Sequence, residues 1–269
     1  MKKIILVLVT VMLLLPNQIK ALSVTASSAI LMDMDSGRIL YQKDIHNQRL
    51  IASITKIMTA VIAIENGNLD DVVTVGEEVL TMYGSNIYIE LGETMTLRDL
   101  LYGLLLRSGN DAAIVIGTYI GGSEEKFVEM MNKKAKEIGM IHTIYHNCHG
   151  LDEVTKNYST AYDMAILSSY ANTLEVYREI TGTKKWETKT NKKSYIWYNR
   201  NKLLTSYEYA TGGKTGYTPS AGRTLVTTAK KDGLNLTAVT LNDPNEYVSH
   251  ENMYEYGFNN YKNYLIVDK

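Results

Sequence analysis

The serine and lysine of Ser53-x-x-Lys56 are the residues of this chain best suited to covalent chemistry. On an α-helix, side chains three residues apart share a face, so the amine can reach the hydroxyl, and a serine in the first turn lies near the positive end of the helix dipole. A free serine is a poor nucleophile. A lysine activates it only if burial or a neighbouring cation lowers the pKa of the amine. The pair is therefore a candidate for nucleophilic catalysis.

The same spacing occurs again in Ser123-Glu-Glu-Lys126. Two glycines precede this serine and two acidic residues follow it, a pattern typical of the capped start of a solvated helix. We interpret the second match as structural. The spacing alone therefore does not identify a catalytic pair.

Two further motifs could supply a hydroxyl, an amide and a cation. Ser108-Gly-Asn110 follows an apolar, helix-like run, and a turn on such a rigid scaffold can face a cleft. Lys214-Thr-Gly216 follows two glycines, so its backbone can approach a ligand closely beside a positive charge. Each motif alone is equally typical of an ordinary turn or strand. As the ordered set Ser-x-x-Lys, Ser-x-Asn and Lys-Thr-Gly, the motifs favour a single catalytic site.

The elements that must position these motifs follow an α/β (α+β) pattern, with strands at both ends of the chain and helices between them. Apolar runs on either side of Asp35-Ser-Gly37 predict an early hairpin, and runs around Asp232-Gly233 predict a late one. Thr96 and Thr160 each precede an aspartate by three residues and are predicted helix caps. This order predicts a sheet built from both chain ends, with an inserted helical lobe. The predicted helices are 53–65, 97–106, 111–119, 124–138, 160–170 and 245–256, and strand-like segments lie at 72–75, 87–89 and 186–197.

The composition excludes several classes of protein. The 269 residues are 45% hydrophobic and 21% charged, which is ordinary for a globular protein with a sizeable core. A formal net charge of -1 without a long basic run argues against nucleic acid as the main partner. Because Cys148 is the only cysteine, the chain cannot form an internal disulfide.

The first 21 residues predict export. Met1-Lys-Lys3 precedes an apolar run at residues 4–15, then Pro16 and a short polar stretch that ends at Ala21. This is the pattern of a secretory signal peptide, and the apolar run is shorter than the roughly 20 residues that span a bilayer. We expect cleavage near Ala21, with residues 22–269 as the catalytic domain in the extracellular or cell-wall space. Membrane contact is expected only if the signal segment is retained.

Longer segments around the motifs resemble one family. Residues 29–41, 51–59, 107–112 and 213–218, with His149-Gly-Leu151, are similar to low-molecular-weight penicillin-binding proteins of the serine-type D-alanyl-D-alanine carboxypeptidase family. The resemblance covers essentially all of residues 28–258. It implies a β-lactamase-like or DD-peptidase-like antiparallel sheet flanked by helices, and removal of the terminal D-alanine from the pentapeptide stem of peptidoglycan. It also implies β-lactams as covalent inhibitors, no metal and no cofactor.

The resemblance implies a role for each motif residue. Ser53 is expected to be the nucleophile that the penultimate D-alanine acylates, with Lys56 as its general base. Ser108 is expected to shuttle protons, and Asn110 to hold the peptide or to position Lys56. The family's oxyanion hole uses the backbone N–H groups of the nucleophile and of the residue after Lys-Thr-Gly. The predicted substrate-binding residues are Lys214, Thr215, Gly216 and Tyr217.

The chain also departs from the family pattern. Ile51 replaces a usual proline, and Asn86 replaces a common serine. Many relatives bind the substrate carboxylate with an arginine that follows the second strand of the late hairpin; residues 241–247 contain none, and Arg223 is the candidate replacement. Relatives often continue into a β-rich domain with a membrane-binding tail. Because this sequence ends at Lys269, we expect both to be absent.

A zinc site is one alternative. His142, His146, Cys148 and His149 lie within eight positions, and their side chains are zinc ligands in many proteins. They lack the glutamate of a His-Glu-x-x-His helix, so we favour a loop-stabilising role for His149.

Related functions of the same fold stay open. A β-lactamase needs a glutamate to activate the deacylating water, and no suitable Glu-x-x-x-Asn segment lies between Asn110 and Lys214. A DD-endopeptidase would use the same residues as a carboxypeptidase. A catalytically silent wall-binding protein would have no need to keep both Ser53 and Lys56.

Overall fold

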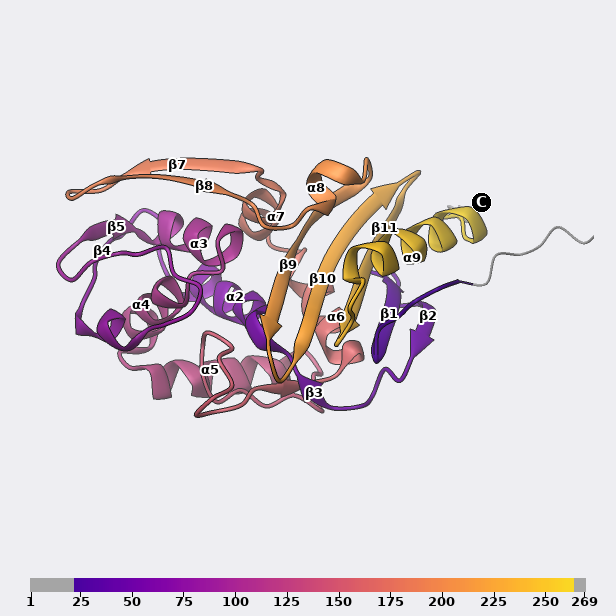
Figure 1. Ribbon diagram of the computed structural model, residues 1–269, viewed down its shortest axis with the longest axis horizontal. Coiled ribbons are helices and arrows are strands. Elements are labelled where there is room, and N and C mark those ends of the chain that lie inside the picture. The colour runs from indigo at the N-terminus through magenta and orange to yellow at the C-terminus, as the bar shows by residue number, and fades with distance from the viewer. Residues whose placement is uncertain (1–21, 264–269) are drawn as a thin grey trace, which may run out of the picture.

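A five-stranded antiparallel sheet joins the two ends of the described chain, which in the computed structural model comprises residues 22–263. Its strands lie in the order β2 (Ile39–Lys43), β1 (Ser28–Asp33), β11 (Leu234–Leu241), β10 (Gly222–Lys231) and β9 (Ala210–Thr218). β1 lies beside β11 and pairs with it (Figure 1), with Ile30 opposite Val239 in the register. The predicted sheet of N- and C-terminal segments is therefore confirmed. The predicted signal peptide, residues 1–21, lies outside the described residues.

Both predicted hairpins form. β1 pairs with β2, and β10 is joined to β11 through Asp232 and Gly233, whose φ angles are 49° and 82°. Two successive positive φ values are those of a tight turn that matches the twist of paired strands. β9 is left at the edge of the sheet opposite β2. This edge strand carries the Lys-Thr-Gly motif.

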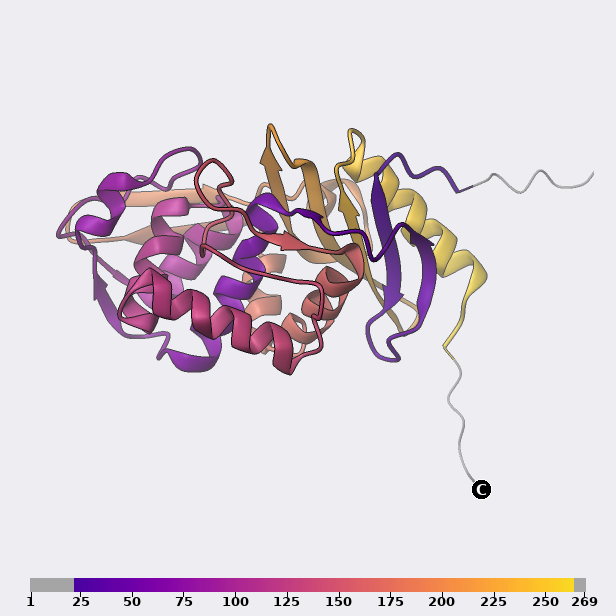
Figure 2. The same ribbon diagram turned by 90° about the horizontal axis from the view of Figure 1, so that it is seen from below.

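Helices cover both faces of the sheet (Figures 1 and 2). α9 (Glu246–Asn260) packs on β10 and β11, where Leu236 and Tyr254 belong to one apolar cluster. α6 (Ala161–Ala171) packs on the other face. α2 (Lys56–Asn66) lies between α6 and the helical lobe, and it is buried over most of its length. The lobe contains α3 (Leu97–Leu106), α4 (Asn110–Gly121) and α5 (Glu124–Glu137).

Three predicted caps are confirmed. The side chains of Thr96, Ser123 and Thr160 accept hydrogen bonds from backbone N–H groups three residues further on, and each begins a helix. The cap at Ser123 bears out the structural interpretation of the second Ser-x-x-Lys match. The remaining elements are β3 (Arg49–Leu50), η1 (Ala52–Thr55), β4 (Val72–Thr74), η2 (Glu77–Thr81), β5 (Thr94–Thr96), β6 (Tyr158–Ser159), α7 (Glu175–Gly182), β7 (Lys185–Lys189), β8 (Ser194–Tyr198) and α8 (Leu203–Ser206).

Two expectations about the elements were wrong, and one helix was not predicted. The helix predicted from residue 53 begins at Lys56, because η1 forms a 3-10 turn before it. Residues 87–89 are not a strand: their backbone N–H groups donate to the carboxylate of Asp111 instead of to a neighbouring strand. α7 was not predicted. Among the described helices, none is both long and apolar enough to span a membrane.

Candidate active site

Ser53 lies on a tight turn that the surrounding chain holds in place. It belongs to η1, and the preceding residue, Ala52, has a φ of 49°, a conformation that L-residues rarely adopt. Gly150 packs against this turn: a Cβ at Gly150 would lie 2.1 Å from the Ala52 carbonyl oxygen and 3.0 Å from the Ser53 nitrogen. The strained backbone persists because neighbouring segments fix it. The Ser53 side chain therefore has a defined position at the start of α2.

Lys56 is fully buried, and its Nζ contacts three groups. It donates to Ser53 Oγ at 3.1 Å, to Asn110 Oδ1 at 2.7 Å and to the carbonyl oxygen of His149. Burial lowers the pKa of Lys56 to about 7, because the low-dielectric surroundings disfavour the charged amine. A large fraction of this amine is therefore neutral at neutral pH, and the neutral form can accept the Ser53 proton.

Asn110, the first residue of α4, is fixed by two hydrogen bonds. Its Oδ1 faces Lys56, and its Nδ2 donates to the carbonyl oxygen of Tyr83 at 2.7 Å. The next residue, Asp111, accepts the N–H of Ile87 at 3.0 Å and that of Tyr88 at 2.7 Å. The start of α4 thus anchors the loop at residues 83–90 beside Lys56.

The second and third motifs meet through their side chains. Lys214 is buried, and its Nζ donates to Ser108 Oγ at 3.0 Å and to the carbonyl oxygen of Thr215 at 2.7 Å. Burial lowers the pKa of Lys214 well below its usual range, and the positive charge of Lys56 lowers it further. The hydrogen bond between Lys214 and Ser108 therefore brings the second and third motifs together at one site.

Gly216 brings β9 against the turn of the serine. A Cβ at Gly216 would lie 2.4 Å from Thr224 Oγ1, 3.0 Å from the Ser53 nitrogen and 3.1 Å from the Ile54 nitrogen. The next residue, Tyr217, is 62% exposed. Its ring lies 5.8 Å from the Arg223 guanidinium on β10. Tyr217 and Arg223 therefore lie side by side on the exposed surface of this strand pair.

The comparison with protein families agrees with this arrangement. The model of a family described as D-alanyl-D-alanine carboxypeptidase, peptidase S11, matches residues 16–245. The chain belongs to this family. The resemblance that the three motifs carry is thereby confirmed.

Comparison with individual proteins supports the same family assignment. The D-alanyl-D-alanine carboxypeptidase DacF of Bacillus subtilis is 40% identical over 220 residues, which are 80% of this chain and 56% of the relative. DacC of Escherichia coli is 36% identical over 235 residues, which are 83% of this chain and 58% of the relative. The chain therefore spans less than two thirds of the length of these two curated relatives.

Solved structures of the family confirm the predicted fold. A D-alanyl-D-alanine carboxypeptidase from Mycobacterium tuberculosis superposes with a TM-score of 0.84 at 29% identity, covering 88% of this chain and 92% of that one. The Streptomyces K15 DD-transpeptidase gives a TM-score of 0.83 at 30% identity, covering 88% of this chain and 98% of that one. The antiparallel sheet flanked by helices, with its inserted lobe, is thus the family fold.

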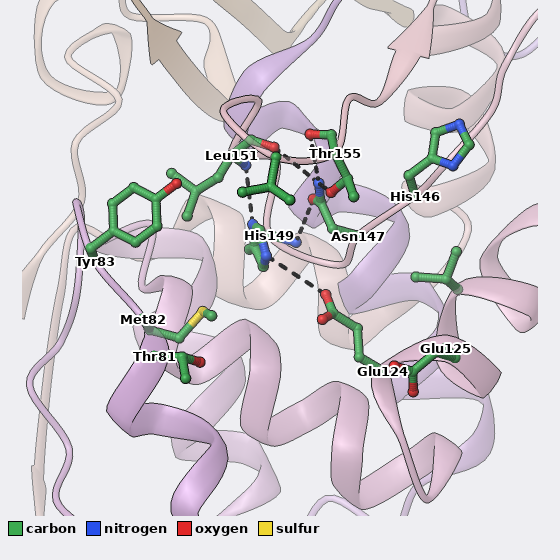
Figure 3. Close-up of a pocket in the computed structure, with 12 residues that line it drawn as sticks. Thr81, Met82, Tyr83, Glu124, Glu125, His146, Asn147, His149, Leu151 and Thr155 are labelled. Carbon is green, nitrogen blue, oxygen red and sulfur yellow. Dashed lines mark hydrogen bonds and ion pairs between the residues drawn. The ribbon is translucent and has the colours of Figure 1, made fainter.

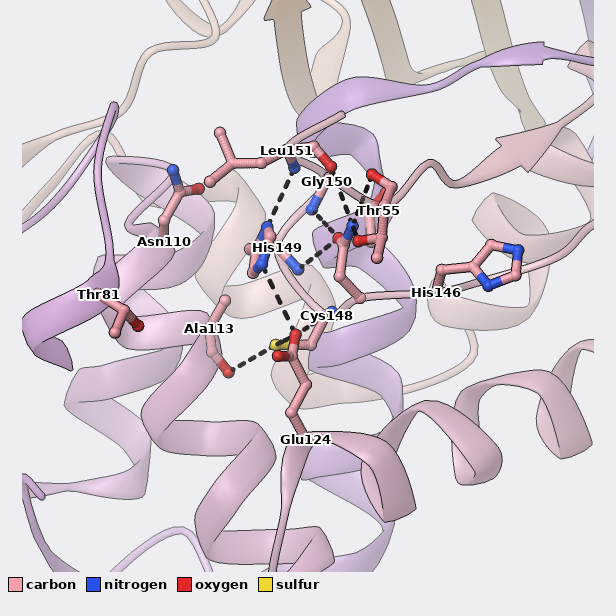
Figure 4. A network of polar contacts seen from close by, with 12 residues as sticks. Thr55, Thr81, Asn110, Ala113, Glu124, His146, Cys148, His149, Gly150 and Leu151 are labelled. Atoms are coloured by element: carbon pink, nitrogen blue, oxygen red, sulfur yellow. Dashed lines mark hydrogen bonds and ion pairs between the residues drawn. The ribbon is translucent and has the colours of Figure 1, made fainter. Parts of the chain in front are cut away.

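His149 closes a loop in this family member. Its Nδ1 accepts the N–H of Leu151 at 3.0 Å, and its Nε2 lies 3.6 Å from Glu124 Oε1 (Figures 3 and 4). Cys148 is buried beside Glu124, whereas His146 is exposed. Within residues 22–263, no three side chains of His, Cys, Asp or Glu are grouped as metal ligands would be. The histidine-rich segment therefore has the contacts of a structural loop.

The structure gives the contacts of the three residues at which the sequence departs from the family pattern. Ile51 is buried, and its carbonyl oxygen accepts a hydrogen bond from Thr224 Oγ1 at 3.0 Å. Asn86 accepts the N–H of Asp111 through Oδ1 at 3.3 Å and so supports the start of α4. Arg223 lies on β10 directly opposite Tyr217, and its Nη1 is 3.4 Å from Glu246 Oε1.

Reasoning from the sequence missed two residues of this carboxypeptidase-family site. Asp111 organises the loop at residues 83–90, although its place directly after Ser108-Gly-Asn110 was a signal. Gly150 permits the close approach of its loop to Ser53. Its φ of 89° and this contact both require glycine, but neither is visible in the order of residues alone.

For the carboxypeptidase activity that the family description names, we expect Gly216→Ala to lower kcat/KM by about 10² to 10³-fold, the usual cost of losing one oxyanion donor. The new Cβ would press on the Ser53 nitrogen and on Thr224 Oγ1. Steady-state kinetics, with circular dichroism to verify folding, would measure this. The double variant Gly216→Ala/Thr224→Ala relieves only the threonine clash. Recovery of full activity in the double variant would contradict the proposed effect on Ser53.

Proposed function

We propose that the protein is a serine D-alanyl-D-alanine carboxypeptidase that acts on peptidoglycan stem peptides and is acylated by β-lactams. The observation that carries this proposal is the contact between the buried Lys56 amine and the Ser53 hydroxyl at 3.1 Å. Support comes from the family assignment and from the lowered pKa of Lys56, about 7. Residues 1–21, read as a signal peptide, would deliver the enzyme to the cell-wall space.

The proposed reaction has two steps. Neutral Lys56 takes the Ser53 proton, and Ser53 Oγ bonds to the carbonyl carbon of the penultimate D-alanine. The N–H groups of Ser53 and Tyr217 stabilise the oxyanion. The peptide C–N bond then breaks, and the leaving D-alanine receives a proton through Ser108, which Lys214 holds in place. Water hydrolyses the ester and restores Ser53.

The remaining site residues hold the substrate in this proposal. Asn110, bonded to Lys56 and to the loop carbonyl of Tyr83, orients the base and the peptide. Lys214, through its amine, and Thr215, through its hydroxyl, donate hydrogen bonds near the terminal carboxylate. A DD-transpeptidase reaction is the second candidate, because the similar Streptomyces K15 structure carries that name. In that reaction an amine replaces water in the second step.

The decisive test measures free D-alanine released from diacetyl-L-lysyl-D-alanyl-D-alanine by the purified protein, with and without EDTA. We expect release that EDTA does not change. A folded protein that releases no D-alanine and forms no adduct with labelled penicillin would refute the proposal. Adding glycine or another acceptor amine separates the two candidates, because a transpeptidase would convert part of the peptide to an aminolysis product.

We expect Arg223→Ala to raise KM for this peptide roughly tenfold with a smaller change in kcat, because a charge-assisted hydrogen bond to the terminal carboxylate would be lost. Arg223 is exposed and lies on β10 opposite Tyr217, the residue that follows Lys-Thr-Gly on β9. Arg38→Ala is the matched control, since Arg38 also lies over a tyrosine ring, 5.3 Å from that of Tyr261, but beside the opposite edge strand of the sheet. Equal KM values for the two variants would exclude Arg223 from carboxylate binding.

A further inference from the structure

The loop at residues 147–152 is held by its own hydrogen bonds where it passes the proposed nucleophile. Asn147 Oδ1 accepts the N–H of Gly150 at 2.7 Å, and Asn147 Nδ2 donates to the carbonyl oxygen of Leu151 at 2.9 Å (Figure 3). Gly150 in turn packs on the turn of Ser53, where a Cβ would lie 3.0 Å from the serine nitrogen. The loop therefore supports the backbone N–H of Ser53, the first proposed oxyanion donor.

The same loop reaches the end of β9. Asp152 Oδ2 accepts a hydrogen bond from Thr218 Oγ1 at 2.6 Å, and both residues are buried. Thr218 is the last residue of β9 and directly follows Tyr217, whose backbone N–H is the second proposed oxyanion donor. Thr218 Oγ1 also accepts the N–H of Ala221 at 3.0 Å, so the hydroxyl joins the loop to the turn between β9 and β10. One loop thus contacts the segments that carry both donors.

β9 is an edge strand, so its position beside the serine depends on contacts outside the sheet. Only β10 pairs with it, and their register ends where Thr218 lies opposite Gly222. Among the hydrogen bonds of residues 22–263, none joins Tyr217 directly to the turn of Ser53. An oxyanion hole works only when both donors lie within hydrogen-bonding distance of one oxygen, so a small shift of β9 would weaken it.

We propose that Asp152 is a positioning residue for the oxyanion hole, which acts through Thr218 to hold the backbone N–H of Tyr217 beside the serine. The inference rests on the proposed function, because that reaction defines the oxyanion. A hydroxyl that donates to a carboxylate makes a short, strong hydrogen bond, and 2.6 Å lies within the range of such bonds. Asp152 is not among the groups bonded to Lys56, so it acts on the spacing of the donors and not on proton transfer.

The test uses variants that remove or keep this one hydrogen bond. We expect Thr218→Val and Asp152→Ala each to lower kcat for D-alanine release by roughly tenfold with little change in KM, because the oxyanion forms only in the transition state. The double variant should be no slower than the slower single variant, since both changes break the same contact. Thr218→Ser keeps the hydroxyl and should keep most of the parent kcat.

Thr143→Val is the matched control. The hydroxyl of Thr143 donates to the buried carboxylate of Asp163 at 2.7 Å, which is the same kind of hydrogen bond in a segment that carries none of the three motifs. Its loss should lower the melting temperature about as much as Thr218→Val does, without changing kcat. An equal fall of kcat in Thr143→Val and Thr218→Val would overturn the inference, because activity would then follow stability alone.

A peptide boronic acid, diacetyl-L-lysyl-D-boroalanine, reports the oxyanion hole without turnover. The serine oxygen bonds to boron, the serine proton passes to the base, and a boron hydroxyl takes the place of the oxyanion. We expect the Kd of this adduct to rise in Thr218→Val by the factor by which kcat/KM falls. Binding of the substrate peptide to Ser53→Ala, measured by NMR titration, should be the same with and without Thr218→Val.

The two measurements separate this inference from the proposed function. Folded Thr218→Val and Asp152→Ala proteins that keep both the parent kcat and the parent Kd would overturn the inference alone. A parent that binds the boronic acid but releases no D-alanine would refute the carboxypeptidase, and the Kd values of the variants would still decide the role of Asp152. A parent that does neither would overturn both.

Discussion

Ser53→Ala should reduce D-alanine release by on the order of 10⁶-fold, the scale seen when other serine hydrolases lose their nucleophile. No other hydroxyl is bonded to the buried Lys56 amine among the described contacts, so no other group can take over the attack. The fold should be retained, since Lys56 Nζ keeps Asn110 Oδ1 and the carbonyl oxygen of His149 as acceptors. D-alanine release and the covalent adduct with labelled penicillin are the two measurements.

Ser123→Ala is the matched control for this prediction. It removes the serine of the second Ser-x-x-Lys segment, whose hydroxyl oxygen caps α5. Loss of such a cap typically lowers the free energy of unfolding by about 1 kcal/mol. Activity should be unchanged. An adduct that persists in Ser53→Ala, or one that disappears in Ser123→Ala, would show that the nucleophile has been assigned to the wrong segment.

Lys56→Gln should lower kcat by about 10³ to 10⁴-fold, because the variant cannot accept the Ser53 proton, and general bases contribute up to about 10⁴-fold. Glutamine is chosen because its amide can still donate to Asn110 or to the carbonyl oxygen of His149. The fold is therefore expected to survive, as a melting curve would verify. A variant that retains more than about a tenth of the parent rate would exclude Lys56 as the base.

The pH dependence of kcat/KM in the unsubstituted protein also tests the role of Lys56. Burial lowers the pKa of Lys56 to about 7, so the amine is protonated and inactive as a base below that pH. We expect kcat/KM to fall about tenfold per pH unit below 7 and to level off above it. The charge of Arg200 helps to lower this pKa, so Arg200→Ala should move the acidic limb to higher pH. A parent rate that stays constant between pH 8 and pH 6 would contradict the role of Lys56.

Local signals in the sequence determined most of the elements. Asp232-Gly233 predicted the late hairpin, and Thr96 and Thr160 predicted two helix starts, because these interactions join residues only a few positions apart. The strand predicted at residues 87–89 was wrong because the hydrogen bonds of this segment are made to a residue that is distant in the sequence. Their apolar pattern resembles a strand, but their hydrogen-bond partner, Asp111, lies more than twenty positions away.

The sequence by itself also determined the family, because three ordered motifs are specific where one is not. The tertiary structure supplied the physical reason why the first Ser-x-x-Lys pair, and not the second, is suited to nucleophilic chemistry. Lys56 is buried and contacts Asn110 and the loop of His149, whereas Ser123 caps a solvated helix. A lysine becomes a base through desolvation, and desolvation depends on distant segments that pack around it. The hydrogen bond between Asp152 and Thr218 has the same origin, since its two residues lie 66 positions apart in the sequence.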